Sequence, residues 1–313
     1  MAEWTNAVDC KSIVRKNCGG SNPPPSTMKI TEISKLFENE PLIINWHNIK
    51  RLKNNKSGSI FFGLGLVSRN QLSVGIPFDI LSFFFVSEIL KNSLNLSKVI
   101  VLIADSHALS NRIFDNMQIQ NQANLTLTQA QKIVRNFAFN NFEIIMASDM
   151  HKLPSFQSIL SKLPKFENKY LRLEIADTLW LTNNRNLKIK IGWAISKENR
   201  TEGNDERFFD NDIIKMCPNL SLIHLQAGRT LDSNRPKASP YLSVRNEHRI
   251  LLLKNENVNE KLKTAKNNWT DKSMGGLISH LHDIVHSFEN IQGRLPFNTL
   301  EQKIKFILDK ATV

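Results

Sequence analysis

The feature that most constrains the fold is a pair of nearly continuous apolar runs on either side of a segment of helical length. The runs are residues 58–67 (GSIFFGLGLV) and 98–109 (KVIVLIADSHAL), and residues 78–94 between them have the length and period of a helix. Strands that are buried on both faces have this composition. We therefore expect two strands of a parallel sheet joined by a helix.

The same alternation continues along the chain and predicts the fold class. Further elements are expected at 126–139 (a helix capped by Thr128), 142–148 (a strand), 152–166 and 168–181 (helices), 186–195 (a strand) and 204–225 (a helix, then a strand). Alternating strands and helices favour an α/β fold. The expected architecture is a Rossmann-like, doubly wound parallel sheet with C-terminal helices.

Shifts in composition divide the chain into three parts. Residues 1–27 are basic and end in CGGSNPPPST, which is too rich in Gly, Ser and Pro to pack. We expect a disordered arm there, a Rossmann-like domain over 28–250 and a helical extension over 251–313.

The charge balance points to an anionic partner. The chain has 41 Lys and Arg against 29 Asp and Glu, a formal net charge of +12. Such an excess favours nucleic acid ahead of a membrane surface, although many basic proteins bind neither. The longest apolar stretch, 76–90, carries Asp79 and Glu88 and is too short and too polar to span a bilayer.

Cysteine and histidine usage gives no sign of a metal site. The three cysteines are scattered, without a disulfide framework or zinc-like spacing. His282 and His286 are one helical turn apart, and a solvated helix face explains them better than a metal. We expect a reduced, cytoplasmic protein with no metal, no cofactor and no membrane association.

Candidate site residues begin with the helix at 168–181. Tyr170, Glu174 and Asp177 are spaced by four and then three residues, which places them on one helical face. A solvated surface would explain such a face in an average helix. Other polar residues, however, follow predicted strands, where ligands bind in open α/β sheets. They are Ser68, Arg69 and Asn70 after the first strand and Asp105 and His107 after the second.

Three of these segments resemble the catalytic domain of class I tyrosyl-tRNA synthetases. VIVLIADSHALSN resembles their LxADLHA strand end, and Tyr170-xxx-Glu174-xx-Asp177 resembles their YxxxQxxD helix, which holds the amino group of tyrosine. GNDERFF, with Asp205, resembles their GG-x-DQR turn. Their order and approximate spacing agree over roughly residues 58–245.

Both ATP-binding signatures of that family are missing. Residues 73–76 read SVGI, without the histidines of the HIGH element, and only Lys237 and Ser239 match the KMSKS loop. The charge that develops during adenylate formation would then have no obvious stabiliser. The resemblance implies a synthetase fold that no longer activates amino acids.

That combination resembles the cyclodipeptide synthases, over roughly residues 58–195. These enzymes take amino acids from two aminoacyl-tRNAs and release a diketopiperazine without ATP or a cofactor. They carry Glu where the synthetases have Gln, as Glu174 does here. The resemblance extends to the longer yeast-type members, such as the enzyme that begins the pathway to pulcherriminic acid.

The resemblance implies roles for individual residues. A strict fit of the family's Gly-x-Ser-x-x-Asn pattern puts Gly65 at the nucleophile position. Ser68, the first hydroxyl after the strand, would therefore be the nucleophile, and Ser73 is the alternative. Tyr170 and Glu174 would hold the substrate amine. Substrate binding is expected at Asn70, Asp105, His107, Asp177, Trp193 and Asp205, and tRNA binding at Arg69, Lys132, Arg135, Lys162, Lys165, Lys188 and Lys190. Apolar pocket walls are expected at Leu66, Phe84, Leu102 and Leu173, which favours hydrophobic amino acids, as in cyclo-Leu-Leu.

Other functions fit parts of the same pattern. A divergent tyrosyl-tRNA synthetase-like ligase would keep the fold, although SVGI at 73–76 argues against it. A non-catalytic tRNA-binding protein would have no need of Tyr170 and Glu174. A dinucleotide site at 63–70 lacks the third glycine of its fingerprint. The protein is expected to be a monomer or a homodimer with two aminoacyl-tRNAs as substrates.

Overall fold

The computed structural model describes residues 42–44, 46–52, 57–68, 71–72, 76, 80–110, 114–164, 169–193, 213–225, 282 and 284–312. The expected arm over 1–27 lies outside these residues, as does Asp205. Within the described part, no helix has the length and apolar character that crossing a membrane requires.

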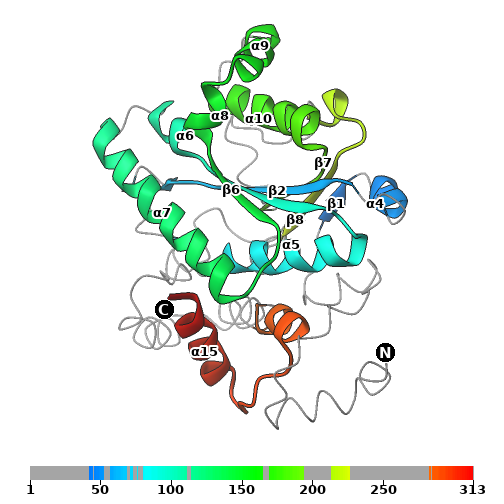
Figure 1. The fold of residues 1–313 in the computed structure, drawn as a ribbon, viewed down its shortest axis with the longest axis vertical. Helices are drawn as coiled ribbons and strands as arrows, with labels where there is room; N and C mark the ends of the chain where they lie inside the picture. Colours follow the sequence, from blue (N-terminus) through cyan, green and yellow to red (C-terminus); the bar gives the residue numbers. More distant parts are fainter. Residues whose placement is uncertain are drawn as a thin grey trace, which may run out of the picture.

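A six-stranded sheet forms the centre of the molecule (Figure 1). Its order is β1 (Leu42–Ile44), β8 (Ser221–Leu225), β7 (Leu187–Trp193), β2 (Ser59–Leu64), β5 (Lys98–Ile103) and β6 (Phe142–Met146). All neighbouring strands are parallel except β1, which is antiparallel to β8 at one edge. The predicted parallel α/β sheet is confirmed.

Helices cover both faces of this sheet (Figure 1). The principal described helices are α4 (Trp46–Leu52), α5 (Leu81–Leu94), α6 (Asp105–Ser110), α7 (Asn116–Asn136), α8 (Ala147–His151), α9 (Pro154–Lys162), α10 (Lys169–Arg185) and α15 (Leu300–Thr312). Of these, α9 packs on α10 and α15 on α7, farther from the sheet. The two short strands β3 (Val67–Ser68) and β4 (Gln71–Leu72) pair as a separate antiparallel ribbon. The sheet is therefore doubly wound, as the alternation of elements predicted.

Successive side chains of β2 pack into two hydrophobic cores, one on each face of the sheet. Ile60 and Phe62 are fully buried on the face that α5 and α7 cover, whereas Phe61 packs on the opposite face with Ile175 and Trp180 of α10. Because successive side chains of a strand point to opposite faces, a strand buried on both must be apolar throughout. This requirement explains the uninterrupted apolar run in the sequence.

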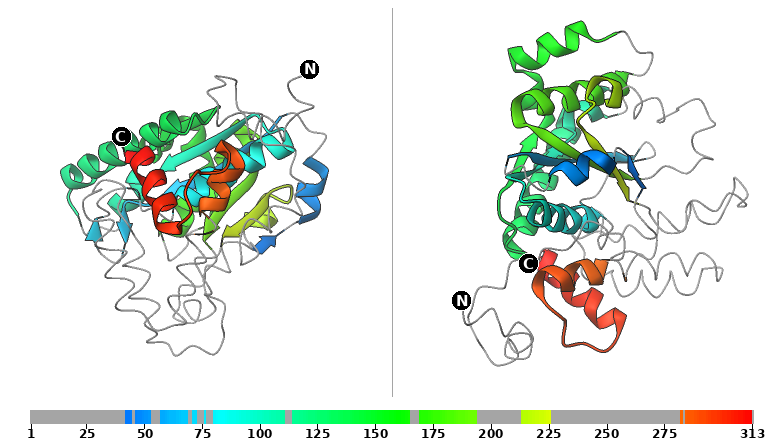
Figure 2. Two further views of the ribbon diagram at one scale, coloured as in Figure 1. Left: turned by 90° about the horizontal axis from the view of Figure 1, so that it is seen from below. Right: turned by 90° about the vertical axis from the view of Figure 1, so that its right-hand side faces the viewer.

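The described C-terminal helices belong to the core on the α5 face. Residues 284–292 are helical, and they lie together with α15 on this side of the sheet (Figure 2). Phe288 makes edge-to-face contacts with Phe85 of α5 and Phe137, which follows α7. Asn136 also donates a hydrogen bond from its side chain to the carbonyl of Lys310 at 2.9 Å. The sequence predicted these helices as an extension, and their apolar faces complete the central core.

Two element boundaries differ most from the predictions. The strand expected over 98–109 ends at Ile103, and α6 begins at Asp105. The helix expected to begin at Thr128 begins at Asn116, where Asp115 and Gln118 form a capping box. Gln122, a buried polar side chain ahead of the expected start, interrupts the apolar periodicity on which the prediction rested.

The chain reverses direction across the sheet at β2. From β2 it continues to β5 and β6 on one side, and then crosses to β7 and β8 on the other. In open α/β sheets, ligands bind at the carboxyl ends of the strands at such a reversal. Here those ends carry Gly65 and Gly192, and a Cβ added to either would meet no atom of the described residues within 4 Å. The described part of the fold thus leaves space where a ligand is expected.

Candidate active site

Helix α10 places two carboxylates beside this end of the sheet. Ile175, Ala176 and Leu181 are fully buried against the sheet and set the rotation of the helix. Glu174 and Asp177, one turn apart, are held in different environments by this packing. The side chain of Glu174 is 31% exposed, whereas that of Asp177 is 2% exposed. The Glu174 carboxylate is therefore accessible to a ligand, whereas the Asp177 carboxylate is buried.

Glu174 forms an ion pair with Lys190 of β7. The Nζ atom lies 2.5 Å from Oε1, and the Lys190 side chain is 13% exposed. The same ammonium lies 6.0 Å from the centre of the Phe61 ring. Lys190 was expected to bind tRNA, but the structure directs it to Glu174, and little of the side chain is left for a phosphate.

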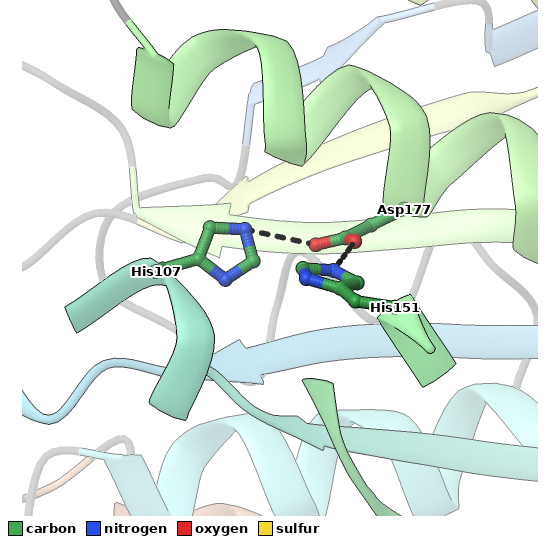
Figure 3. Close-up of side chains that lie close together, drawn as sticks. All are labelled: His107, His151 and Asp177. Carbon is green, nitrogen blue, oxygen red and sulfur yellow. Dashed lines mark hydrogen bonds and ion pairs between the residues drawn. The ribbon is translucent and has the colours of Figure 1, made fainter. Parts of the chain in front are cut away.

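Asp177 bridges two histidines (Figure 3). Its Oδ2 lies 3.0 Å from Nε2 of His107 on α6, and its Oδ1 lies 2.7 Å from Nε2 of His151 on α8. All three side chains are buried. The sequence suggested that Asp177 and His107 bind substrate, whereas the structure brings them together with His151 in a network that uses both carboxylate oxygens.

The network shifts the pKa values of two members. Burial opposes a charge on His107, but the hydrogen bond and the charge of Asp177 outweigh it, with smaller contributions from Glu174 and Asp105, so the pKa of His107 is raised above 6.5. Burial likewise opposes the charge on Asp177, but hydrogen bonds from His107 and His151 outweigh it and lower the pKa below 3.8. Both shifts favour the imidazolium form of His107 and the carboxylate form of Asp177.

This pairing predicts a pH dependence of stability. A raised pKa in the folded state stabilises the protein below the ordinary value of 6.5, and the contribution is lost as pH rises through the raised pKa. We expect the free energy of unfolding to fall over this range more steeply in the wild type than in His107→Gln. Denaturant titrations at several pH values above 6 measure both slopes. Parallel slopes would contradict the assignment.

The sequence did not predict His151 as a site residue. Its ring stacks on Phe156 with 4.2 Å between ring centres, and its carbonyl accepts a hydrogen bond from Gln157. Its Nδ1 lies 2.8 Å from Oγ of Ser106. The available signal was its position, since it comes a few residues after the third parallel strand. Sequence spacing alone did not relate it to Asp177.

The predicted site residue Asp105 has a structural contact. The residue is 2% exposed, and its Oδ1 accepts a hydrogen bond from the backbone N–H of Ser148 at 2.8 Å. This bond ties the end of β5 to the start of α8. Asp105 therefore holds together the two segments that carry His107 and His151.

Within the described part of the chain, His107, His151 and Asp177 are also the group that could hold a metal ion, since their ligating atoms lie within 4.8 Å of one another. However, the distances of 2.7 and 3.0 Å between imidazole nitrogen and carboxylate oxygen are those of N–H···O hydrogen bonds. Each such bond requires a proton on the imidazole nitrogen, whereas coordination of a metal requires a lone pair on that nitrogen. The geometry fits a hydrogen-bond network.

Three further predicted site residues are described at the level of the backbone. Ser68 ends β3 and pairs with Gln71 of β4, Tyr170 is in the first turn of α10, and Trp193 ends β7. These positions bring Trp193 to the carboxyl end of the sheet and Ser68 to the ribbon that follows β2. The remaining predicted residues outside the described part are Arg69, Asn70, Ser73 and Lys165.

The predicted pocket walls do not line one pocket. Leu66 and Phe84 belong to the core on the α5 face, while Leu102 belongs to the core on the α10 face. Leu173 is half-buried on α10. The prediction was wrong for Leu66 and Phe84, because apolar composition does not reveal which face of the sheet a side chain enters.

The predicted basic residues also lie on different parts of the molecule. Lys132 and Arg135 are on α7, which packs in the α5-face core, whereas Lys162 is on α9, which packs on the opposite face. Lys188 is half-buried on β7. The described lysines and arginines of the predicted set therefore do not form one continuous surface.

Comparison with known proteins gives the fold. No protein-family model and no curated protein sequence matches the chain. Among solved structures, a product-bound parasite tRNA synthetase aligns at 14% identity with a TM-score of 0.53, covering 97% of this chain and 90% of its own. Tyrosyl-tRNA synthetase from Archaeoglobus fulgidus aligns at 12% identity with a TM-score of 0.47, covering 91% and 98%. By its sheet topology and its alignment with the parasite synthetase, the chain has a Rossmann-like α/β fold resembling the catalytic domains of class I aminoacyl-tRNA synthetases.

Proposed function

We propose that the protein is a cytoplasmic cyclodipeptide synthase, which uses two aminoacyl-tRNAs to form a diketopiperazine through an aminoacyl-serine intermediate. The observation that carries the proposal is the partly exposed Glu174 carboxylate, paired with Lys190 beside the open glycine positions of the sheet. An aminoacyl ester carries a free α-ammonium, and a partly buried carboxylate binds such a group through a charge-assisted hydrogen bond.

The ion pair with Lys190 fits this role. Lys190 bonds to Oε1 of Glu174, and Oε2 is the oxygen that would accept the substrate ammonium. Lys190 holds the carboxylate in one orientation from the sheet side, while the exposed side of Glu174 meets the ligand. Space for the amino-acid side chain is proposed beside Gly65 and Gly192, where an added Cβ meets none of the described residues within 4 Å.

The chemistry needs no ATP, because the acyl group of an aminoacyl-tRNA is already activated as an ester. A serine oxygen attacks the ester carbonyl, the bond to the tRNA ribose breaks, and the ribose hydroxyl leaves with a proton. The amine of this aminoacyl-enzyme attacks the second aminoacyl ester and releases the second tRNA. The new terminal amine then attacks the seryl ester, which closes the ring and frees the serine. The family resemblance suggests Ser68 as this serine.

The substrates are proposed to be hydrophobic amino acids such as leucine. Support comes from the half-buried Leu173, which precedes Glu174 on α10, and from the absence of a side chain at Gly65 and Gly192. A side chain with a positive charge would need its own buried carboxylate. Among the described residues of the network, Asp177 already pairs with two histidines.

The purified chain, mixed with aminoacyl-tRNAs and without ATP, is expected to release a diketopiperazine that mass spectrometry identifies. The masses name the two amino acids directly. The control is the same mixture with uncharged tRNA. Exchange of pyrophosphate into ATP without any diketopiperazine would instead establish a synthetase-like ligase. Binding of tRNA with neither reaction would leave a tRNA-binding protein, and both results overturn the proposal.

A further inference from the structure

We propose that Ser106 is a nucleophilic serine, with His151 as its general base and Asp177 as the residue that positions His151. The identity of the acyl donor, an aminoacyl ester, rests on the proposed function. The reactivity of Ser106 rests on the hydrogen-bond geometry alone. In the proposed function Ser106 takes the role of acyl acceptor that the family resemblance suggests for Ser68.

The two ring nitrogens of His151 have different partners. Nε2 lies 2.7 Å from Oδ1 of Asp177, and Nδ1 lies 2.8 Å from Oγ of Ser106. A carboxylate only accepts hydrogen bonds, so Nε2 must carry the proton. In a neutral imidazole, Nδ1 is then a bare acceptor, and the hydroxyl of Ser106 donates to it. This order, from hydroxyl to imidazole to carboxylate, is the one that activates a serine.

Ser106 is more exposed than His151 and Asp177, the two residues proposed to activate it. Asp177 is 1% exposed and His151 9% exposed, whereas Ser106 is half-buried. The base is thus screened from water, whereas Ser106 keeps part of its surface exposed. The His151 ring is held by stacking on Phe156 and by its two hydrogen bonds. A base fixed in this way keeps its lone pair directed at one oxygen.

Ser106 also lies at the correct end of the fold. It is the third residue after β5, in the first turn of α6, at the carboxyl edge of the parallel sheet. Helix α6 contacts α10, the helix that carries Glu174. The hydroxyl and the proposed ammonium-binding carboxylate are therefore on neighbouring helices.

The proposed step is an acyl transfer that balances without another reagent. Oγ of Ser106 attacks the ester carbonyl carbon as its proton passes to Nδ1 of His151. The bond from that carbon to the tRNA ribose oxygen breaks, and the ribose oxygen takes the proton back from Nδ1. The products are the seryl ester and the free tRNA hydroxyl. Asp177 stabilises the imidazolium that forms between the two transfers.

A fluorophosphonate probe tests this reactivity without tRNA. A bond forms between the serine oxygen and phosphorus, fluoride leaves, and the serine proton passes through His151 to solvent. Trypsin releases Ser106 in the peptide 99–112 and Ser68 in the peptide 57–69, so mass spectrometry of the labelled full-length protein separates them. We expect the label on peptide 99–112.

Matched variants locate the label within that peptide. Ser110 shares it, but its hydroxyl donates to the carbonyl of His107 at 2.7 Å, so Ser110→Ala is expected to keep the label. Ser106→Ala is expected to lose it. His151→Gln should slow labelling by about 100-fold or more, the usual contribution of a general base. Thermal unfolding confirms that each variant is folded.

The outcomes separate this inference from the proposed function. Label absent from peptide 99–112, or retained in a folded Ser106→Ala, overturns the nucleophile. An acid-quenched reaction with aminoacyl-tRNA should also leave the aminoacyl group on peptide 99–112, and its appearance on 57–69 would assign the role to Ser68 and overturn the inference. Labelling at Ser106 without any diketopiperazine would support the nucleophile while the proposed function fails.

Discussion

Replacing Glu174 with Gln is expected to lower diketopiperazine formation by about 100-fold, which corresponds to about 2.7 kcal/mol of transition-state stabilisation. Gln keeps the size of the side chain and removes the charge that would hold the substrate ammonium. It also leaves the ammonium of Lys190, now 2.5 Å from a carboxylate oxygen, without its ionic partner. The measurement is the initial rate of product formation at several aminoacyl-tRNA concentrations.

Glu143 provides a control of equal exposure. Its side chain is also 31% exposed and forms an ion pair with Lys98 at 2.8 Å, but it lies on β6 away from Glu174. Glu143→Gln removes the same charge from partly exposed ion pairs, with Lys98 and with Arg185 at 3.4 Å, so it is expected to leave the rate within a factor of about two. Equal losses in both variants would show that the effect comes from general destabilisation, and the ammonium-binding role would be abandoned.

Replacing Asp177 with Asn is expected to lower the free energy of unfolding by about 3–5 kcal/mol, as when one partner of a buried ion pair is removed. The carboxylate accepts from two imidazoles, and an amide offers one acceptor and one donor group. The amide NH₂ then faces an imidazole N–H, and the buried His107 loses its counter-charge. Denaturant unfolding monitored by circular dichroism measures the loss.

Asp149 is the matched control for this substitution. Its carboxylate also contacts a cation, Lys152, at 3.3 Å, but the two side chains are 73% and 75% exposed. Exposed ion pairs contribute little to stability, so Asp149→Asn should change the free energy of unfolding by less than about 0.5 kcal/mol. If Asp177→Asn proved equally mild, the three-residue network would not be the buried charge cluster that its distances indicate.

The elements that the sequence predicted correctly are those that depend on residues close together in the chain. The apolar run at 58–67 and the helix carrying Glu174 and Asp177 depend on neighbours within a few residues, and both were predicted. The start of α7 was missed because its buried face there includes Gln122, which a periodicity argument counts as exposed. Similarly, the two faces of the sheet cannot be told apart from apolar composition.

The sequence by itself determined the alternation of strands and helices, and hence a parallel sheet with polar residues after its strands. Only the tertiary structure decided which of those residues meet. Asp177 bonds to His151 across 26 residues of chain, Ser106 bonds to His151 across 45, and Glu174 bonds to Lys190 across 16. These pairings arise because α6, α8 and α10 pack at one edge of the sheet. The packing is set by the shapes of buried side chains, which a linear pattern does not record.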